Sequence, residues 1–135
     1  MALILCAIVS GCSEPSAPSD NQDRQIAQLE IAAQRGDRSA LRELDILYGM
    51  RGDSLNRERI YNIRLEQRDP EALDEFIQAL LSQGERTADC NTKMRLNSRA
   101  KEEAVELAKA QGVADPSKDI LVRAADQAIQ ETDCH

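Results

Sequence analysis

The stretch Asp69–Gly84, "DPEALDEFIQALLSQG", carries the strongest secondary-structure signal in the chain. Its large apolar residues recur at positions i, i+3, i+4, i+7 and i+8, namely Leu73, Phe76, Ile77, Leu80 and Leu81. Residues with this spacing share one face of an α-helix. Asp69 is a favourable N-cap, and Pro70 is favoured at the first helical position. The stretch therefore predicts an amphipathic helix with one buried face.

The composition of the whole chain agrees with a helical fold. Of its 135 residues 41% are hydrophobic, but only 2% are aromatic, and Tyr48, Tyr61 and Phe76 are the whole aromatic set. The core must therefore be built from Leu, Ile and Ala. Ala and Leu favour helix, whereas the β-branched and aromatic residues that fill sheets are scarce. We expect an all-α protein.

Similar periodicity on both sides of this stretch predicts five further helices. They cover residues 25–35, 38–50, 55–67, 93–111 and a last segment that follows Asp115-Pro116 and runs to about 132. Between the first two, Gly36 ends one helix and Asp37 is a natural N-cap for the next. In the segment 55–67 the apolar residues alternate, so a strand is the alternative there. We expect about six helices in antiparallel pairs, as a short helical repeat or an irregular bundle.

An apolar segment near the beginning of the chain points to export. Residues 2–9, "ALILCAIV", are too few to span a bilayer but have the length of a signal-peptide core. The next residues, Val9-Ser10-Gly11-Cys12, resemble the lipobox of bacterial lipoproteins. The resemblance implies that signal peptidase II cuts before Cys12 and that Cys12 is acylated on its sulfur. Ser13 fits the sorting of such proteins to the outer membrane, with the domain facing the periplasm.

This interpretation divides the chain into a signal peptide (1–11), a flexible tether (12–24) and a helical domain (25–135). The tether sequence "SEPSAPSDNQD" is polar, contains two prolines and has no periodicity. "MALIL" lacks the basic residue that the lipoprotein family carries near its start. A buried N-terminal helix is the alternative for the apolar segment.

Two cysteines, Cys90 and Cys134, remain after the leader and the lipidated residue are set aside. Disulfides persist in an oxidising periplasm. If the last two helices form an antiparallel hairpin, both cysteines come to the same end of it. A metal pair with His135 is the alternative, but three such residues fall short of a four-ligand zinc site. We expect a disulfide that closes the hairpin, and no metal or other cofactor.

The sequence also contains an internal similarity at a spacing of 32 residues. The shift superposes identical residues: Ile31 on Ile63, Asp37 on Asp69, Ala40 on Ala72 and Leu41 on Leu73. A period of this size is typical of stacked helix pairs. The stretch "LEIAAQRGDRSALRELDILYG" resembles the Sel1-like and tetratricopeptide families, which implies a concave, protein-binding face. Chance similarity between two amphipathic helix pairs is the alternative.

Charge and residue types exclude several functions. The formal net charge of −7 argues against nucleic acid, whose phosphates require Lys and Arg. Arginines do gather between residues 51 and 68, but acidic residues interleave with them, as on a solvated helix face or on a patch for an acidic partner. The single histidine is His135, and no Gly-rich phosphate loop or nucleophile elbow is present. The chain is therefore not expected to be an enzyme or to bind a small-molecule substrate.

Binding of another protein is the function that fits best. We expect a membrane-anchored helical adaptor for an envelope or secretion-type assembly, whose partner contacts Tyr48, Arg57, Tyr61 and Arg64. The alternative is a periplasmic immunity protein that neutralises a basic toxin or hydrolase, because acidic surfaces accelerate association with cationic partners.

Overall fold

The computed structural model describes residues 20–132 and residue 134, and this part of the chain is all-α. The predicted lipobox, Cys12 and the start of the predicted tether lie outside these residues. The helices are α1 (Asp20–Gln34), α2 (Arg38–Met50), α3 (Ser54–Glu66), α4 (Pro70–Arg86), α5 (Cys90–Ala110) and α6 (Ile120–Gln130), with a short 3₁₀ turn η1 (Pro116–Lys118) before α6. The predicted all-α fold of about six helices is confirmed, and the segment for which a strand was the alternative is helix α3.

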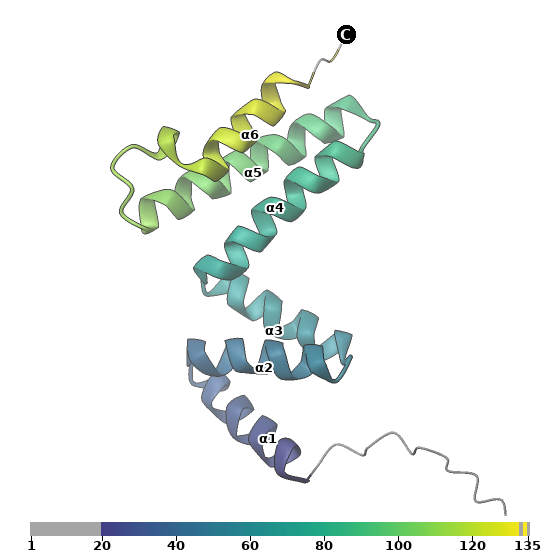
Figure 1. The fold of residues 1–135 in the computed structure, drawn as a ribbon, viewed down its shortest axis with the longest axis vertical. Helices are drawn as coiled ribbons and strands as arrows, with labels where there is room; N and C mark the ends of the chain where they lie inside the picture. Colours follow the sequence, from purple (N-terminus) through teal and green to yellow (C-terminus); the bar gives the residue numbers. More distant parts are fainter. Residues whose placement is uncertain (1–19, 133, 135) are drawn as a thin grey trace, which may run out of the picture.

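The molecule is elongated and consists of two groups of three helices (Figure 1). We call α1–α3 the N-terminal unit and α4–α6 the C-terminal unit. The turn between α3 and α4 lies near the middle of the long axis, and α1 and the end of α6 lie toward opposite ends. No helix in the described part of the chain is long and apolar enough to cross a membrane.

Aspartate N-caps begin every helix from α2 onward. Asp37 accepts hydrogen bonds from the backbone N–H groups of Ser39 and Ala40, at 2.9 and 3.2 Å. The corresponding caps of the later α-helices are Asp53, Asp69, Asp89 and Asp119. An N-cap satisfies backbone donors that have no partner within the helix. The prediction that Asp37 and Asp69 are caps is confirmed.

Three predicted helix boundaries are wrong, and each has a local cause. Helix α1 begins at Asp20 rather than at residue 25, so residues 20–24 of the expected tether are helical, with acidic residues in the first turn. Helix α5 begins at Cys90 because Asp89 caps it. After Pro116 the chain makes one 3₁₀ turn, and Asp119 then caps α6 at Ile120.

Each unit has its own hydrophobic core. The core of the N-terminal unit consists of Ile26, Ala33, Ala40, Leu41, Leu44, Leu47, Tyr48 and Ile60. Alanine has a larger share in the C-terminal unit, whose core consists of Leu73, Ile77, Leu80, Ala100, Ala104, Leu107, Val122 and Ala125. Small side chains at a helix contact allow the two backbones to approach closely.

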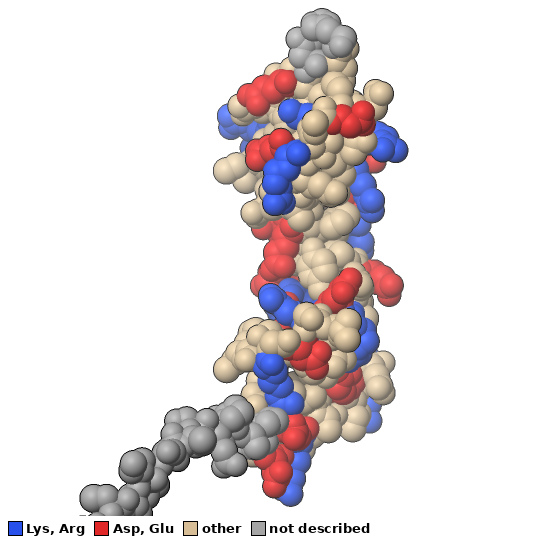
Figure 2. Space-filling view, turned by 90° about the vertical axis from the view of Figure 1, so that its right-hand side faces the viewer, with Lys and Arg blue, Asp and Glu red and all other residues tan. Residues whose placement is uncertain are grey.

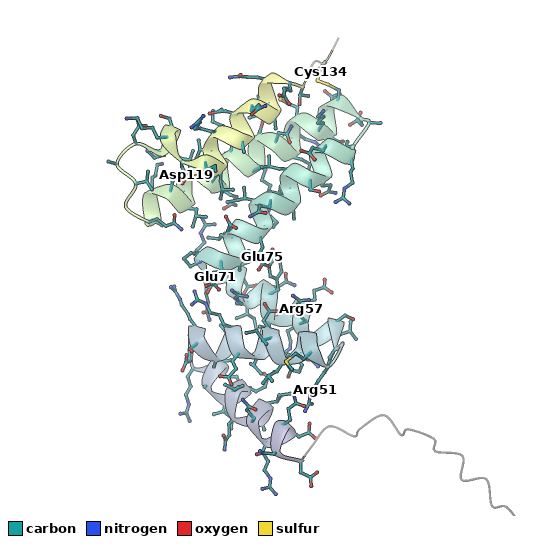
Figure 3. All side chains as sticks on the ribbon, in the orientation of Figure 1. Arg51, Arg57, Glu71, Glu75, Asp119 and Cys134 are labelled. Carbon is teal, nitrogen blue, oxygen red and sulfur yellow. A yellow bond between two sulfur atoms is a disulfide. The ribbon has the colours of Figure 1, made fainter. Side chains whose placement is uncertain are left out.

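The C-terminal unit is fixed at its far end by a disulfide and a buried amide. Cys90, at the start of α5, is bonded to Cys134 beyond the end of α6, with 5.7 Å between their Cα atoms (Figure 3). Asn97 of α5 donates hydrogen bonds from Nδ2 to the carbonyl oxygen of Ala128 and to Thr132 Oγ1. The predicted hairpin closed by a disulfide is confirmed.

The internal similarity has a mixed outcome. Asp37 and Asp69 are both N-caps, and the superposed pairs Ala40 with Ala72 and Leu41 with Leu73 are all buried. However, α2 packs extensively against α1 and α3, whereas α3 and α4 contact each other much less. The relationship to Sel1-like or tetratricopeptide repeats stays a prediction.

Candidate functional site: a surface formed by α2, α3 and α4

A hollow lies where the side chains of α2, α3 and α4 meet. Its lining residues are Asp45, Ser54, Arg57, Glu58, Tyr61 and Glu75, and its volume is about 340 Å³. Figure 3 shows Arg57 on the first half of α3 and Glu75 on the first half of α4. This volume would hold about ten water molecules, so the hollow has room for one long side chain of a partner. We call it the tyrosine hollow.

A second hollow adjoins the first along α2. It is lined by Asp45, Ile46, Gly49, Met50 and Arg57, and its volume is about 360 Å³. Ile46 and Met50 are 63% and 75% exposed, and they lie four residues apart, on one face of the helix. Exposed apolar side chains gathered in one place are typical of protein-binding surfaces. We call this second site the methionine hollow.

Arg57 separates the two hollows. Its Nε donates a hydrogen bond to Asp45 Oδ1 at 3.0 Å. Its side chain also passes close to Gly49 of α2, where a Cβ would lie 3.6 Å from the Arg57 Nε. Arg57 is thus held across the surface of α2 while 59% of its side chain stays exposed. Such an arginine can contact a partner without first being ordered, which lowers the entropic cost of binding.

Directly behind the tyrosine hollow, a buried ion-pair network connects the two units. The guanidinium group of Arg64 bonds to Asp45 Oδ2 at 2.7 Å, to Asp69 Oδ1 at 3.1 Å and to Glu71 Oε2 at 3.2 Å. Arg42 reaches Asp69 and Glu71 from the solvent side. Arg64 and Asp69 are almost completely buried. The network joins carboxylates of α2 and α4 through one arginine of α3, so it fixes the position of α4 relative to α3.

Two pKa values reflect this arrangement. Burial alone would raise the pKa of Asp69, but the backbone N–H of Ala72 and the charge of Arg64 outweigh burial and lower it. Burial, followed by the charge of Glu75, raises the pKa of Tyr61. Asp69 is therefore charged and Tyr61 neutral over the physiological range. The Tyr61 hydroxyl donates to the carbonyl oxygen of Ala72 at 3.4 Å, so α4 also orients this ring.

The structure separates the four residues that the sequence predicted to contact a partner. Arg57 and Tyr61 line the tyrosine hollow, whereas Arg64 lies behind it in the network. Tyr48 is buried in the N-terminal unit, where its hydroxyl donates to Glu30 Oε1 at 2.6 Å. Tyr48 and Arg64 therefore make internal contacts. The binding roles of Arg57 and Tyr61 stay predictions.

Most of the other lining residues were not predicted from the sequence because they come from helices other than α3. Asp45, Ile46 and Met50 come from α2, while Glu75 comes from α4. The sequence contained a signal only for the exposed apolar pair on α2. Ile46 and Met50 are apolar, but they lie outside the apolar helix face that contains Leu44 and Leu47. The carboxylates looked like ordinary solvated charges.

All five arginines between residues 51 and 68 pair with acidic residues from outside α3. The pairs are Arg51 with Asp23, Arg57 with Asp45, Arg59 with Glu30, Arg64 with Asp45 and Asp69, and Arg68 with Glu103. Figure 2 shows acidic and basic side chains intermixed along one face of the molecule, with uncharged surface near its middle. On that face no charge of a single sign forms a continuous patch.

Within residues 20–132 and residue 134, no three His, Cys, Asp or Glu side chains are arranged to hold a metal ion. Comparisons with protein-family models, with curated proteins and with solved structures find no significant match to this chain.

Proposed function

We propose that this protein is a lipid-anchored adaptor of the bacterial envelope, whose helical domain binds a protein partner through the two hollows of α2, α3 and α4. The observation that carries the proposal is the pairing of exposed apolar side chains with a pre-oriented arginine and tyrosine on one surface. Ile46 and Met50 offer apolar area to a partner, while Arg57 and Tyr61 are of types enriched at binding hot spots.

The rigidity of this surface supports the proposal. Asp45 holds Arg57 on one side and Arg64 on the other, so the floor of both hollows is attached to the buried network. Binding to a surface that is already ordered avoids the cost of fixing side chains and loops. The surface is shared by the two units, so a bound partner would touch both.

The membrane part of the proposal depends on the sequence Val9-Ser10-Gly11-Cys12, which resembles a lipobox. In the host, the Cys12→Ala variant should accumulate as an unlipidated precursor that retains residues 1–11. Metabolic labelling with a fatty acid and the mass of the product measure this. Normal cleavage and labelling of the variant would contradict the lipoprotein assignment.

Site-specific photo-cross-linking in the host tests partner binding. A benzoylphenylalanine is placed at Ile46 or, as the control, at the exposed Glu102 of α5 in the full-length chain. We expect Ile46 to yield cross-linked envelope or secretion components that Glu102 does not yield. Identical products from both positions, or none, would contradict the proposal. A single basic, secreted toxin as the product would instead support the immunity function.

A further inference from the structure

We propose that the tyrosine hollow receives the side chain of a lysine or arginine from the partner, and that a neighbouring apolar residue of the same segment covers the methionine hollow. This inference rests on the proposed function and specifies the chemistry of the partner. It follows from the charges of the lining residues, from the shape of the hollow and from its apolar neighbour.

The charges in the tyrosine hollow are not balanced. Asp45 is paired with Arg57 and Arg64. The side-chain carboxylates of Glu58 and Glu75, in contrast, make no ion pair or hydrogen bond with any residue that the structure describes, although both residues are exposed at the hollow. The two unpaired carboxylates therefore leave a negative site that a cationic side chain would complement.

The tyrosine between these carboxylates selects a long cationic side chain. Lysine and arginine have apolar stems that can lie along an aromatic ring while the charged end stays near solvent and carboxylates. A cation over a tyrosine ring also gains a cation–π interaction. Tyr61 remains neutral because burial and Glu75 raise its pKa, so the ring does not become a competing anion.

A bare metal ion fits this site less well than a cationic side chain does. No group of three potential ligands is arranged for a metal in the described part of the chain, and one of the lining residues is the aromatic Tyr61. A side chain can satisfy both the ring and the carboxylates, whereas an ion would use only the carboxylates.

The methionine hollow determines which type of residue in the partner segment lies next to the lysine or arginine. Ile46 and Met50 are exposed beside Arg57, and a partner that covers them would remove apolar area from water, which favours binding. Methionine adapts its shape to different apolar partners. The partner segment is thus expected to carry Lys or Arg next to an aliphatic or aromatic residue.

The test uses a random peptide library displayed on phage as the probe, selected on the full chain purified in detergent. We expect enriched peptides to contain Lys or Arg beside an apolar residue. Synthetic copies of these peptides are then titrated against the wild type and the double variant Glu58→Gln/Glu75→Gln. We expect the double variant to weaken binding about tenfold. Replacing the Lys of the peptide by norleucine should have the same effect.

The matched control is Glu66→Gln/Glu85→Gln. It removes the same charge from exposed positions of the same two helices, α3 and α4, but outside the hollow. We expect less than a twofold change in the dissociation constant of the peptides. Circular dichroism verifies that both double variants remain folded.

The outcomes separate this inference from the proposed function. Selection of peptides without Lys or Arg, a selection that yields no peptide, or equal effects of the two double variants would overturn the inference. If selected peptides that lack Lys or Arg still bind more weakly to the Ile46→Ser variant, the proposed binding surface is supported although the inference fails. Peptides unaffected by Ile46→Ser and by Tyr61→Ala bind elsewhere, and they would overturn both the inference and the proposed surface.

Discussion

The N-terminal and C-terminal units each contain three helices, yet they hold these helices together by different means. In the N-terminal unit, helices packed on a core of Leu, Ile, Ala and Tyr are linked by arginine–carboxylate pairs such as Arg51 with Asp23 and Arg59 with Glu30. In the C-terminal unit, alanines and a glycine allow close packing, and a disulfide closes the far end. The difference teaches that one small chain can combine a charge-dependent half, which carries most of the candidate site, with a covalently closed half.

Removing the disulfide should have the largest effect, confined to the C-terminal unit. The bond joins residues 44 positions apart, and closing such a loop is worth about 4 kcal/mol in the chain-entropy model. Cys90→Ser should lower the free energy of unfolding by about this amount. Hydrogen exchange should show lost protection in α5 and α6 and little change in α2, because local openings are resolved by segment.

Reduction of the wild type serves as the control for that variant, since it should give the same pattern without a change of sequence. Equal loss of protection in α2 and α5 would show that the two units unfold as one.

Arg64→Met should have the next largest effect, at the connection between the units. It leaves Asp69 buried without its main cationic partner, which costs about 3 kcal/mol. Arg57 is exposed and pairs with Asp45, which also pairs with Arg64. The variant Arg57→Met should therefore cost less than about 1 kcal/mol. Urea unfolding of both variants measures the difference. Similar costs for the two would show that burial of Arg64 has no energetic consequence.

A glycine in each unit tests the packing difference. A Cβ on Gly84 would lie 2.5 Å from Asn97 Oδ1, so Gly84→Ala should destabilise the C-terminal unit by about 2 kcal/mol through overpacking. In α2, the atoms nearest to a Cβ on Gly49 would be those of the Arg57 side chain, at ordinary contact distance. Gly49→Ala should therefore stabilise the protein by up to about 1 kcal/mol through helix propensity. Thermal unfolding of the two variants should shift in opposite directions, and a shift in the same direction would contradict the packing difference.

Tyr48→Phe should have the smallest effect at neutral pH and a distinctive pH dependence. Loss of the hydrogen bond to Glu30 should cost about 1 kcal/mol. Burial, followed by this bond to Glu30, raises the pKa of Tyr48 to about 12. The stabilisation is therefore fully present below the unfolded pKa of about 10 and is lost as the pH rises toward 12.

Unfolding measurements at neutral pH and above about pH 11 test this prediction. At the higher pH the Tyr48→Phe variant should be more stable than the wild type. Both tyrosines of the chain belong to α2 and α3, so tyrosinate absorbance reports on the N-terminal unit alone. A constant difference between the two forms at all pH values would contradict the assigned contact.

Much of the fold could be predicted because its signals are local. The apolar period of residues 73–81 and the caps Asp37 and Asp69 lie within single helices, and each is readable from a few neighbouring residues. The disulfide was also predictable, because antiparallel helices bring Cys90 and Cys134 to one end. The start of α6 was not, because Pro116 and Asp119 offer competing beginnings three residues apart.

The candidate site was less predictable because its residues come from three helices. Arg57 and Arg64 lie seven residues apart on α3 and look alike in sequence, yet one is exposed and the other buried. The difference is made by Asp69, the N-cap of α4, by Glu71 within α4 and by the way α4 packs after the turn at Arg68, whose backbone φ is 55°. No pattern within α3 contains that information.

The position of the disulfide also determines how the protein would respond to mechanical force applied at its two ends. Tension would enter at α1 and leave at Cys134, and the covalent bond would carry it directly to Cys90. The 44-residue separation between the cysteines corresponds to roughly 150 Å of extended chain that a pull cannot release. Under load the N-terminal unit and the connection to α4 would therefore stretch, and the hollows between α2, α3 and α4 would be lost while the loop closed by the disulfide keeps its length.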